Sequence, residues 1–361
     1  MAITDADTVL VLGAGTSAPF GLPLGGILID RIRKRISSER AYLSGDYFSS
    51  RLQEASVSYA AFYRMPFFGA VGYSHVEWNG NSGRIKRSVS TDLGKIGELE
   101  ALLANQTSET IDDFIVENPD YADLAKIGIA AEFMTACYDF DKSRHSAKPF
   151  TMRTNFALNG NDIRNWIHLL INVIRQGIRS GNVSAENKIR IITFNYDTIL
   201  EHVLSEQFSN SQAMQGRDFR DFVDILHVHG QCGELNEQIA SPQKRCVSWA
   251  QGIHVVNEDE VPEEVSKARA TAREWISQAR EIYLCGFAFA WPNLRLLGIE
   301  RPQAQRRRLF VHNYDGNVGL SRTAKMLESK RVSVEINEAT PEKPMQICDW
   351  IRMGYLGEMP G

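Results

Sequence analysis

The stretch Val9–Gly26, VLVLGAGTSAPFGLPLGG, is the strongest indication of the fold that we predict for this chain. A short apolar run ends at Gly13, Gly15 follows, and a helical pattern begins after the glycines. A glycine-rich turn between a strand and a helix lets backbone N–H groups approach a pyrophosphate, and the helix N-terminus adds partial positive charge. The spacing Gly13-x-Gly15-x-x-Ala18 fits a loose dinucleotide-binding pattern, although a tight turn without a ligand needs the same glycines.

Apolar runs typical of buried parallel strands recur toward both ends of the chain. The predicted strands are Thr8–Leu12, Ile189–Phe194, Ile225–Val228, Ile282–Phe287, Leu309–His312 and Val332–Ile336. Helical patterns alternate with these strands, as in Leu24–Ile36, Asp162–Arg179, Glu263–Arg280 and Val318–Lys330. Alternation of this kind predicts an α/β domain with a doubly wound parallel sheet.

The alternation stops between residues 37 and 161. Helical patterns occur there without a βα unit, namely Ile96–Leu103, Ile111–Val116 and Tyr121–Cys137. A structureless loop of this length is implausible in a compact domain. We therefore predict a doubly wound domain, made of residues 1–36 and 162–361, that is interrupted by a mostly helical subdomain of residues 37–161.

Residues 59–78 of the predicted subdomain are rich in aromatic side chains: Tyr59, Phe62, Tyr63, Phe67, Phe68, Tyr73 and Trp78. We expect Pro66, Gly69 and Gly72 to interrupt any regular element there. Aromatic side chains bury large areas, so the segment fits the core of the subdomain. A subunit interface or a lid over a nucleotide is the alternative.

Composition places the chain among ordinary globular proteins. It has 361 residues, a formal net charge of −4 and no apolar stretch long enough to span a bilayer. The first residues, MAITDAD, lack a signal-peptide pattern, so we expect a cytoplasmic protein that does not bind membranes. Its charge does not favour nucleic acid as a partner. The five cysteines form no CxxC pair, which argues against a disulfide framework and against a zinc site.

Polar side chains follow two of the predicted strands. Thr193, Asn195 and Asp197 lie in ITFNYD, and His229 lies in LHVHG. Ligands of open α/β sheets bind outside the carboxyl ends of the strands. A glycine turn, an amide, a carboxylate and an imidazole are therefore expected at one crevice, although each has an ordinary structural use when taken singly.

The ordered motifs GAGTSAPFGLP, TFNYD and HVHG resemble those of the sirtuin superfamily. The later GFAFAWPNL (Gly286–Leu294) and HNYDGN (His312–Asn317) resemble its Gly-containing and Asn-containing nucleotide loops. The likeness covers roughly residues 1–36 and 162–330. It implies a Rossmann-like, sirtuin-like parallel sheet with a large helical insertion after the first βα unit.

The chain also departs from the sirtuin deacylases. Those enzymes have Asp-Phe-Arg after the proline of the first motif, where this chain has Leu24-Gly25-Gly26, and they have a zinc module with paired CxxC motifs. The pattern is similar to the bacterial sirtuin-like domains of anti-phage defence systems, which hydrolyse NAD. SETIDDF (Ser108–Phe114) resembles a helix start in those domains, with Ser108 as the expected helix cap.

This resemblance implies an NAD glycohydrolase that cleaves NAD to nicotinamide and ADP-ribose in abortive infection, with NAD as substrate and no zinc. Asn195 would orient the attacking water and contact the ribose. His229 would hydrogen-bond a ribose hydroxyl and act as general base. Asp197 would fix the loop or contact the nicotinamide-side ribose. The nucleotide-binding residues would be Gly13, Ala14, Gly15, Thr16, Ser17, Gly21, Gly286 and Asn313.

We expect His229→Ala and Asn195→Ala to leave the fold intact, because neither side chain should be central to the core.

A sensor module that binds NAD or ADP-ribose and controls assembly without turnover is the alternative function. A protein deacylase or ADP-ribosyltransferase fits less well, and a hydride-transfer dehydrogenase lacks its second-strand acidic residue. A homo-oligomer and a regulatory partner, such as a HerA-type ATPase or an Argonaute-like protein, are implied by the resembling systems.

Overall fold

The structure is a computed structural model of the chain. It describes residues 7–43, 51, 64–79, 85–108, 110–139, 150–152, 166–211, 214, 216–235, 238–239, 241–256, 258, 260–301, 306–329 and 331–351. The chain forms two compact units. Unit 1 comprises Met1–Pro19, Ala157–Gly230 and Asp259–Gly361, and unit 2 comprises Phe20–Phe156 and Gln231–Glu258.

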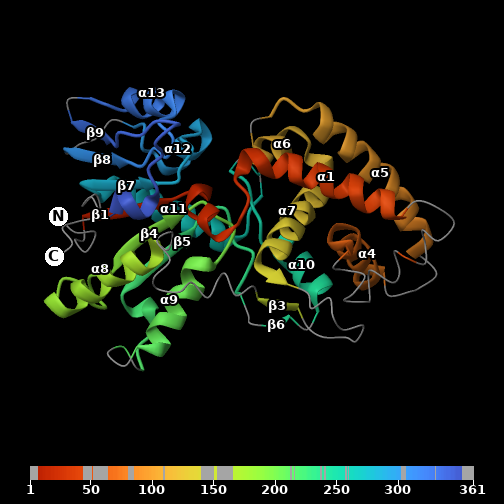
Figure 1. Ribbon diagram of the computed structural model, residues 1–361, viewed down its shortest axis with the longest axis horizontal. Coiled ribbons are helices and arrows are strands. Elements are labelled where there is room, and N and C mark those ends of the chain that lie inside the picture. The colour runs from red at the N-terminus through yellow and green to blue at the C-terminus, as the bar shows by residue number, and fades with distance from the viewer. Residues whose placement is uncertain are drawn as a thin grey trace. The chain divides into compact units, whose positions relative to one another are not determined.

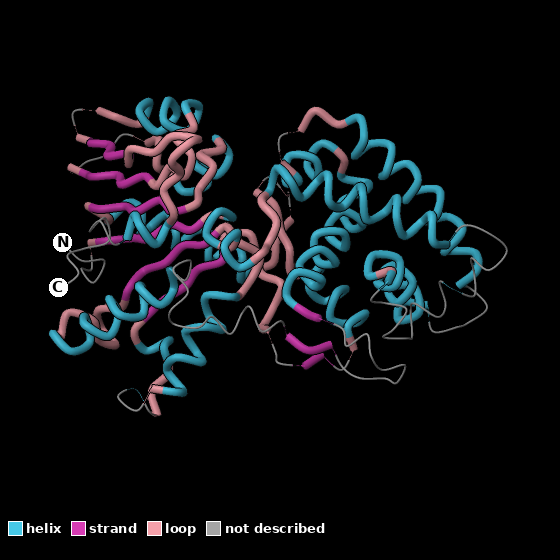
Figure 2. The backbone as a smooth tube through the Cα atoms, viewed as in Figure 1, coloured by secondary structure: helices cyan, strands magenta, loops and turns pink. Residues whose placement is uncertain are grey.

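Unit 1 contains a six-stranded parallel sheet, drawn in magenta in Figure 2. Its strands are β1 (Thr8–Leu12), β4 (Ile189–Thr193), β5 (Val223–His227), β7 (Glu281–Cys285), β8 (Arg307–Val311) and β9 (Val332–Ile336). Their order is β5-β4-β1-β7-β8-β9. Taken in chain order, this is the 3-2-1-4-5-6 arrangement of a doubly wound, Rossmann-like sheet. The predicted α/β class with a doubly wound, Rossmann-like parallel sheet is therefore confirmed.

Strand β1 lies in the middle of the sheet, and all five of its residues are buried. Its last residue, Leu12, is in register with Thr193 of β4 and Cys285 of β7, so these three strands end at one edge. The direction of winding changes between β1 and β7. Open α/β sheets bind their ligands at such a switch point, which makes this edge the expected site.

Helices flank the sheet of unit 1 (Figure 1). They are α8 (Trp166–Ser180), α9 (Ile199–Asn210), α11 (Glu263–Gln278), α12 (Trp291–Leu297), α13 (Val318–Met326) and α14 (Ile347–Trp350). Helix α8 packs beside α9 and α14, and α11 packs beside α12. On α8, the side chains of Ile167, Leu170, Ile171 and Ile174 recur at helical spacing and are buried. Helix α13 ends at Met326, four residues before the predicted end at Lys330.

Unit 2 is mostly helical. It contains α1 (Gly25–Leu43), α4 (Pro66–Asn79), α5 (Ile85–Asn105), α6 (Ile111–Glu117), α7 (Ala122–Cys137) and α10 (Pro242–Gln251). Helix α7 is central, since its residues from Ala125 to Met134 are all buried and α1, α4 and α10 pack on it. A small antiparallel sheet, which the sequence did not indicate, joins β2 (Tyr138–Asp139), β3 (Phe150–Met152) and β6 (Gln238–Ile239).

The boundaries of the two units differ from the predicted domains of residues 1–36, 37–161 and 162–361. Helix α1 belongs to unit 2, although we expected it to complete the first βα unit of the sheet domain. The reason is its packing: Ile32 lies against Gly128 of α7, and Arg35 forms an ion pair with Glu132. Unit 2 also includes Gln231–Glu258, which contributes α10 to its core.

Helix α4 corrects the expectation that Pro66, Gly69 and Gly72 interrupt regular structure, because the helix begins at Pro66 and runs through both glycines. Pro66 is its first residue, where a missing N–H does no harm. Phe67 and Phe68 are buried, in agreement with the predicted subdomain core. Of the other aromatic residues in the segment, Tyr59, Phe62 and Tyr63 lie outside the described residues, as do the side chains of Tyr73 and Trp78.

Helix α6 also begins differently from the prediction. Thr110, and not Ser108, is its N-cap, and the Thr110 hydroxyl accepts a hydrogen bond from the Asp113 N–H. The Ser108 hydroxyl donates to Glu117 instead, over 2.5 Å. Thr110 and Asp113 have the spacing of a capping box, which explains why the helix begins there.

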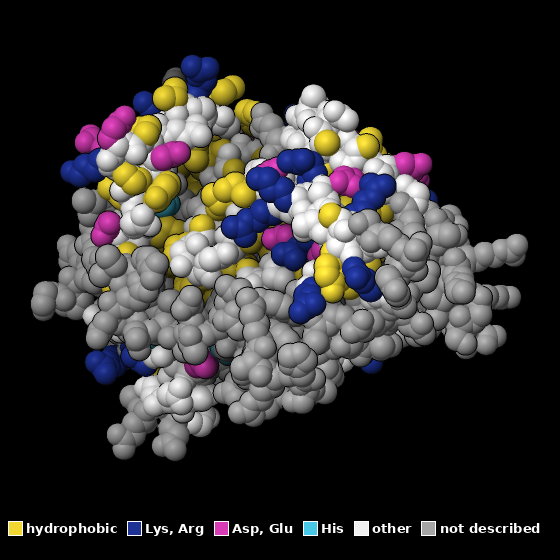
Figure 3. Space-filling model, turned by 45° about the vertical axis from the view of Figure 1, so that its right-hand side comes forward, with side chains coloured by type: hydrophobic (Ala, Val, Ile, Leu, Met, Phe, Trp, Pro, Cys, Tyr) yellow, Lys and Arg dark blue, Asp and Glu magenta, His cyan; other side chains and the backbone are white. Residues whose placement is uncertain are grey.

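The surface of the chain carries charges of both signs. Figure 3 shows Lys and Arg side chains in dark blue, interspersed with Asp and Glu side chains in magenta and hydrophobic side chains in yellow. In the part of the chain that the structure describes, no helix is both long enough and apolar enough to cross a bilayer.

Candidate active site

Most of the predicted site residues follow strands of unit 1 at the carboxyl edge of the sheet. Gly13, Ala14, Gly15, Thr16 and Ser17 follow β1, Asn195 and Asp197 follow β4, His229 follows β5, Gly286 follows β7 and Asn313 follows β8. Hydrogen bonds join the loops after β1, β4 and β7. The site therefore has a defined geometry within unit 1.

Gly13, Gly15 and Gly286 pack backbone against backbone. A Cβ atom on Gly13 would lie 2.5 Å from the Gly286 carbonyl oxygen, and one on Gly15 would lie 2.7 Å from the Gly286 Cα. Gly286 has a positive φ of 59°, and a Cβ there would lie 2.5 Å from the Thr16 nitrogen. Contact between the loops after β1 and β7 therefore requires glycine at all three positions, whether or not a ligand binds.

The backbone N–H groups of the loop after β1 are largely engaged. Gly13 N–H donates to Cys285 O over 2.9 Å, and Gly15 N–H donates to Gly286 O over 3.0 Å. The loop itself is a 3-10 turn in which the Thr16 and Ser17 N–H groups donate to the carbonyls of Gly13 and Ala14. Among the described residues, the Ala14 N–H has no acceptor, and Ala14 is exposed. In this conformation the loop thus offers one free N–H rather than a full cradle.

Asn195 is held by the hydroxyls of that loop. Its Nδ2 donates to Thr16 Oγ1 and to Ser17 Oγ, each over 2.9 Å. Both hydroxyls have used their own protons, since Thr16 donates to Gly13 O and Ser17 donates to Asp197 Oδ2. The Asn195 amide therefore has one orientation, with Oδ1 on the other side. Oδ1 is buried and has no hydrogen-bond partner among the described residues, although a buried acceptor normally has one.

Asp197 lies next to this network. Its Oδ2 accepts from Ser17 over 2.7 Å, and its Oδ1 accepts from the N–H of Ile199, at the start of α9, over 3.2 Å. Burial raises the pKa of Asp197 above its ordinary value, while the hydrogen bonds from Ser17 and Ile199 oppose this rise. The carboxylate thus fixes the turn between β4 and α9.

His229 is only 1% exposed and contacts two aromatic rings. Phe194 meets it edge to face with ring centroids 5.0 Å apart, and the Tyr196 ring centroid lies 5.9 Å away. The Phe194 ring in turn contacts Phe287, from the loop after β7. The expectation that His229 lies outside the core is therefore wrong, because the imidazole is part of an aromatic cluster at this edge.

Asn313 organises its own loop. Its backbone exchanges two hydrogen bonds with the Asn337 side chain. Its Nδ2 donates to Asn317 O and Ser321 Oγ, and its Oδ1 accepts from the Asn317 N–H. Asn313 is 1% exposed, so it shapes the loop after β8, and a direct contact with a nucleotide stays a prediction.

Gly21 is exposed and has a positive φ of 87°, so it turns the chain as expected. It belongs to unit 2, as does the N-terminus of α1, which begins at Gly25. A helix directly after the glycines was predicted to supply positive charge to a pyrophosphate. Two short 3-10 turns, Ala14–Thr16 and Ala18–Phe20, follow β1 instead.

Two residues of the site, Trp166 and His227, were missed in the sequence. Trp166 Nε1 donates to Thr16 O over 2.8 Å, which supports the loop after β1. His227, at the end of β5, contacts the backbone carbonyl of Asn195 and the carboxylate of Glu201. The spacing of His227 and His229 was the available signal, since alternate residues of a strand point to one face. No local pattern marks Trp166.

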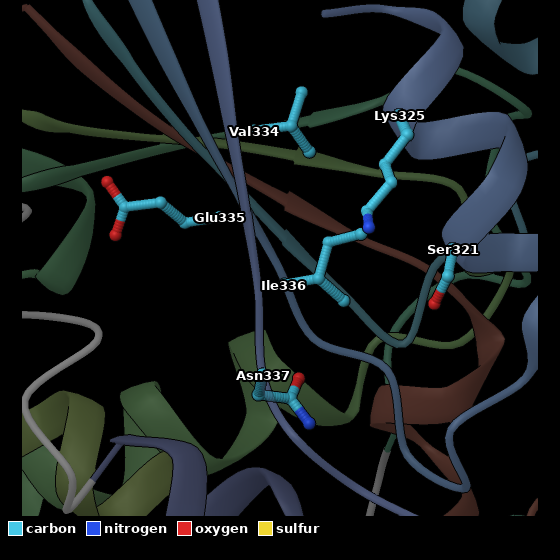
Figure 4. Close-up of a pocket in the computed structure, with 6 residues that line it drawn as sticks. All are labelled: Ser321, Lys325, Val334, Glu335, Ile336 and Asn337. Atoms are coloured by element: carbon cyan, nitrogen blue, oxygen red, sulfur yellow. The ribbon is translucent and has the colours of Figure 1, made fainter.

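A hollow of about 510 Å³ lies between α13 and β9, at the edge of the sheet. Figure 4 shows Ser321 and Lys325 of α13 on one side of it and Ile336 and Asn337 on the other, while Glu335 points away from the helix. The side chains of Ser321 and Asn337 both hydrogen-bond to Asn313. These contacts assign them to the loop after β8, and we assign no ligand to the hollow.

No group of three or more His, Cys, Asp and Glu side chains among the described residues is arranged to hold a metal ion. The five cysteines, all of them among the described residues, are buried and form no disulfide. Comparison with protein-family models, with curated proteins and with solved structures finds no match to this chain. A function for the chain is therefore inferred from its motifs and from the geometry of unit 1.

Proposed function

We propose that the chain is an NAD glycohydrolase of the sirtuin-like type, which cleaves NAD to nicotinamide and ADP-ribose with water as the nucleophile. Three features support the proposal. The strand order is that of a dinucleotide-binding sheet, the polar residues lie at its carboxyl edge, and the motifs GAGTS, TFNYD and HVHG occur in the sirtuin-like order.

The observation that carries the proposal is the Asn195 amide. Two hydroxyls fix its Nδ2, and its Oδ1 is a buried acceptor without a partner in the described part of the chain. An acceptor in this state binds a hydroxyl or a water molecule strongly, because leaving it unpaired is costly. Ribose hydroxyls and the attacking water are the donors that an NAD glycohydrolase has to position.

The remaining groups have defined roles in this proposal. The bond between nicotinamide and ribose breaks through an oxocarbenium-like transition state, and Asn195 Oδ1 orients the water that adds to the anomeric carbon. His229 accepts the proton as general base, since an imidazole titrates near neutral pH. Thr16 and Ser17 hold Asn195 in place, and Asp197 holds Ser17.

A binding module that senses NAD or ADP-ribose is the second candidate. The burial of His229 among Phe194 and Tyr196 favours it, because an imidazole packed on two rings also suits a structural role. The two candidates differ in turnover: both bind the nucleotide, but only the hydrolase releases nicotinamide.

The test is chromatography of nicotinamide and ADP-ribose after incubation of the purified chain with NAD. We expect equimolar products from the wild type and a loss of about 100- to 10,000-fold in rate for Asn195→Ala and His229→Gln. Asn210→Ala is the matched control, since Asn210 is exposed at the far end of α9. Binding of ADP-ribose without product from the wild type would favour the sensor.

We further propose that this activity serves abortive anti-phage defence in the bacterial cytoplasm. A toxic NAD hydrolase has to be restrained until infection, so the proposal includes a homo-oligomer and a regulatory partner such as a HerA-type ATPase. Co-purification of the chain with the product of a neighbouring gene, followed by the product assay with and without it, tests this part.

A further inference from the structure

His227 lies in the site but has no role in the proposed chemistry. Its Nδ1 is 3.1 Å from the backbone carbonyl oxygen of Asn195, and its Nε2 is 2.5 Å from Glu201 Oε1. The His227 side chain is 9% exposed and that of Glu201, in the first turn of α9, is 19% exposed. The imidazole thus bridges the loop after β4 and the start of α9.

The two contacts show which ring nitrogens of His227 carry a proton. A backbone carbonyl oxygen only accepts hydrogen bonds, so Nδ1 must carry a proton. An ionised carboxylate also only accepts, so Nε2 must carry a second one. With a neutral imidazole and an ionised Glu201, a nitrogen lone pair would face a carboxylate oxygen at 2.5 Å. The geometry therefore requires an imidazolium–carboxylate pair, or the same proton shared between the two groups.

We propose that His227 is a positioning residue: its imidazolium, held by Glu201, fixes the backbone of Asn195 and makes the activity of the site depend on the proton of the His227–Glu201 pair. This inference rests on the proposed function for its effect on turnover. The protonation of the pair does not depend on that function, because it follows from the two contacts.

The surroundings of the pair agree with a bound proton. Burial alone lowers the pKa of His227, but the Glu201 carboxylate, the Asn195 carbonyl and Asp197 together raise it above the ordinary value. The charged or titratable groups on the elements packed around β5 include Asp224 on β5 itself, Lys188 before β4, Arg190 on β4, Arg220 and Asp221 before β5, His202 on α9 and Arg269 on α11. Arg269 donates to Val228 O, and Lys188 forms an ion pair with Asp224, so both cations have other partners.

The sign of the pH effect follows. The two contacts place a proton on the pair, and because the pKa of His227 is raised in the folded chain, the pair loses that proton only as the pH rises through the folded value. Deprotonation removes the Nε2–H that donates to the Glu201 carboxylate, and it thereby weakens the bridge between α9 and the Asn195 carbonyl. Turnover should therefore fall on the alkaline side, and that limb should belong to His227 rather than to the general base.

The first test measures protonation directly, by ¹⁵N NMR of the imidazole in the full chain, with His227→Gln used to assign the signal. We expect both ring nitrogens of His227 to be protonated at pH 7, and we expect Glu201→Gln to lower the pKa of His227. At a pH above this pKa, the protonated fraction of His227 falls about tenfold for each unit by which the pKa decreases. A neutral His227 at pH 7, or a pKa unchanged by Glu201→Gln, would overturn the proposal.

The second test separates positioning from mere packing. Asparagine at position 227 places its Nδ2 where the histidine Nδ1 lies, and glutamine places its Nε2 where the histidine Nε2 lies. His227→Asn should therefore retain most turnover without the alkaline limb, whereas His227→Gln should lose at least about tenfold. The side-chain amide signal of Asn195 should move in His227→Gln and stay near its wild-type position in His227→Asn. Equal effects of the two variants on this signal would contradict the positioning role.

Failure of this proposal and failure of the proposed function are distinguishable. If the wild type releases no nicotinamide, the hydrolase proposal fails, while the two NMR measurements still decide the state of His227 and its effect on Asn195. If the wild type is active and Glu201→Gln leaves both the pKa and the alkaline limb unchanged, only the positioning proposal fails.

Discussion

The side-chain amide of Asn195 donates to the Ser17 hydroxyl over 2.9 Å, which ties the end of β4 to the end of β1. The Ser17 hydroxyl passes its own proton to Asp197, so one short chain of hydrogen bonds sets the orientation of the Asn195 amide. The direction of the acceptor oxygen Asn195 Oδ1, which the proposed chemistry uses, is therefore set by Ser17, 178 positions away in the chain.

Ser17→Ala should destabilise the fold and impair the site together. The variant removes the donor to the buried Asp197 carboxylate and one acceptor of Asn195, and leaving such groups unpaired costs about 1–3 kcal/mol. It should also raise the pKa of Asp197 further, since the Ser17 hydrogen bond holds that pKa down. Chemical denaturation measures the first effect. Ser38→Ala, an exposed serine on α1, is the control and should change stability by less than about 0.5 kcal/mol.

Gly15→Ala should be strongly destabilising, by roughly 2 kcal/mol or more, because its Cβ would lie 2.7 Å from backbone atoms that cannot move aside easily. Gly94→Ala is the matched control. Gly94 lies in α5 with no atom within 4 Å of its added Cβ, so the variant should stabilise the chain by about 0.5–1 kcal/mol. Thermal or denaturant unfolding of both variants decides the point, and similar effects would contradict the packing described for the loop after β1.

His229→Ala should destabilise the chain, because it leaves a cavity between Phe194 and Tyr196. The loss should be about 2 kcal/mol or more, as for other large buried side chains cut to alanine. His229→Gln keeps most of the volume and should cost less. The activity test therefore uses the glutamine variant, and denaturation curves of both check the difference. Equal stability of wild type and His229→Ala would show that the imidazole does not pack as described.

Glu39 should make the stability of the chain depend on pH. Its carboxylate is 2% exposed and accepts from the N–H groups of Phe67 and Phe68 at the start of α4. Burial raises the pKa of Glu39 from 4.5 to about 7, although Arg35 and the two N–H groups oppose the rise. The folded state therefore binds the proton more tightly than the unfolded state. The stability gained from this binding is full below pH 4.5 and is lost as the pH rises through 7.

The measurement for Glu39 is the free energy of unfolding of wild type and Glu39→Gln between pH 5 and pH 8. The difference between the two should change over this window by up to about 3 kcal/mol, since each unit of pKa shift corresponds to about 1.4 kcal/mol. Glu300→Gln, at an exposed position in unit 1, is the control. A constant difference between wild type and Glu39→Gln would mean that Glu39 titrates alike in both states.

The sheet was predictable because its signals are local. Each strand of unit 1 is a short apolar run, and the alternation with helices implied parallel order. The placement of α1 was not predictable from its own pattern, because its buried side chains are compatible with packing on a sheet or on α7. The packing of α1 on α7 is determined by the close fit of Ile32 on Gly128, 96 positions away, which no local pattern reveals.

The sequence predicted which residues lie at the site better than it predicted the interactions that they make. Asn195 and Asp197 do meet the loop after β1, as their places at strand ends implied. The glycines were expected to expose N–H groups to a phosphate, but in the structure they permit contact between two loops, and most of the N–H groups are bonded. His227 was missed because its partners, Asn195 O and Glu201, come from other elements.

The proposed hydrolase is best tested by the release of nicotinamide from NAD by the purified chain and by its Asn195→Ala variant, with ADP-ribose binding followed in parallel. We predict equimolar nicotinamide and ADP-ribose from the wild type, and a loss of about 100-fold or more in the variant with its fold retained. Turnover by Asn195→Ala at the wild-type rate would contradict the role given to Asn195, and absence of turnover by the wild type, alone and with its partner, would contradict the hydrolase itself.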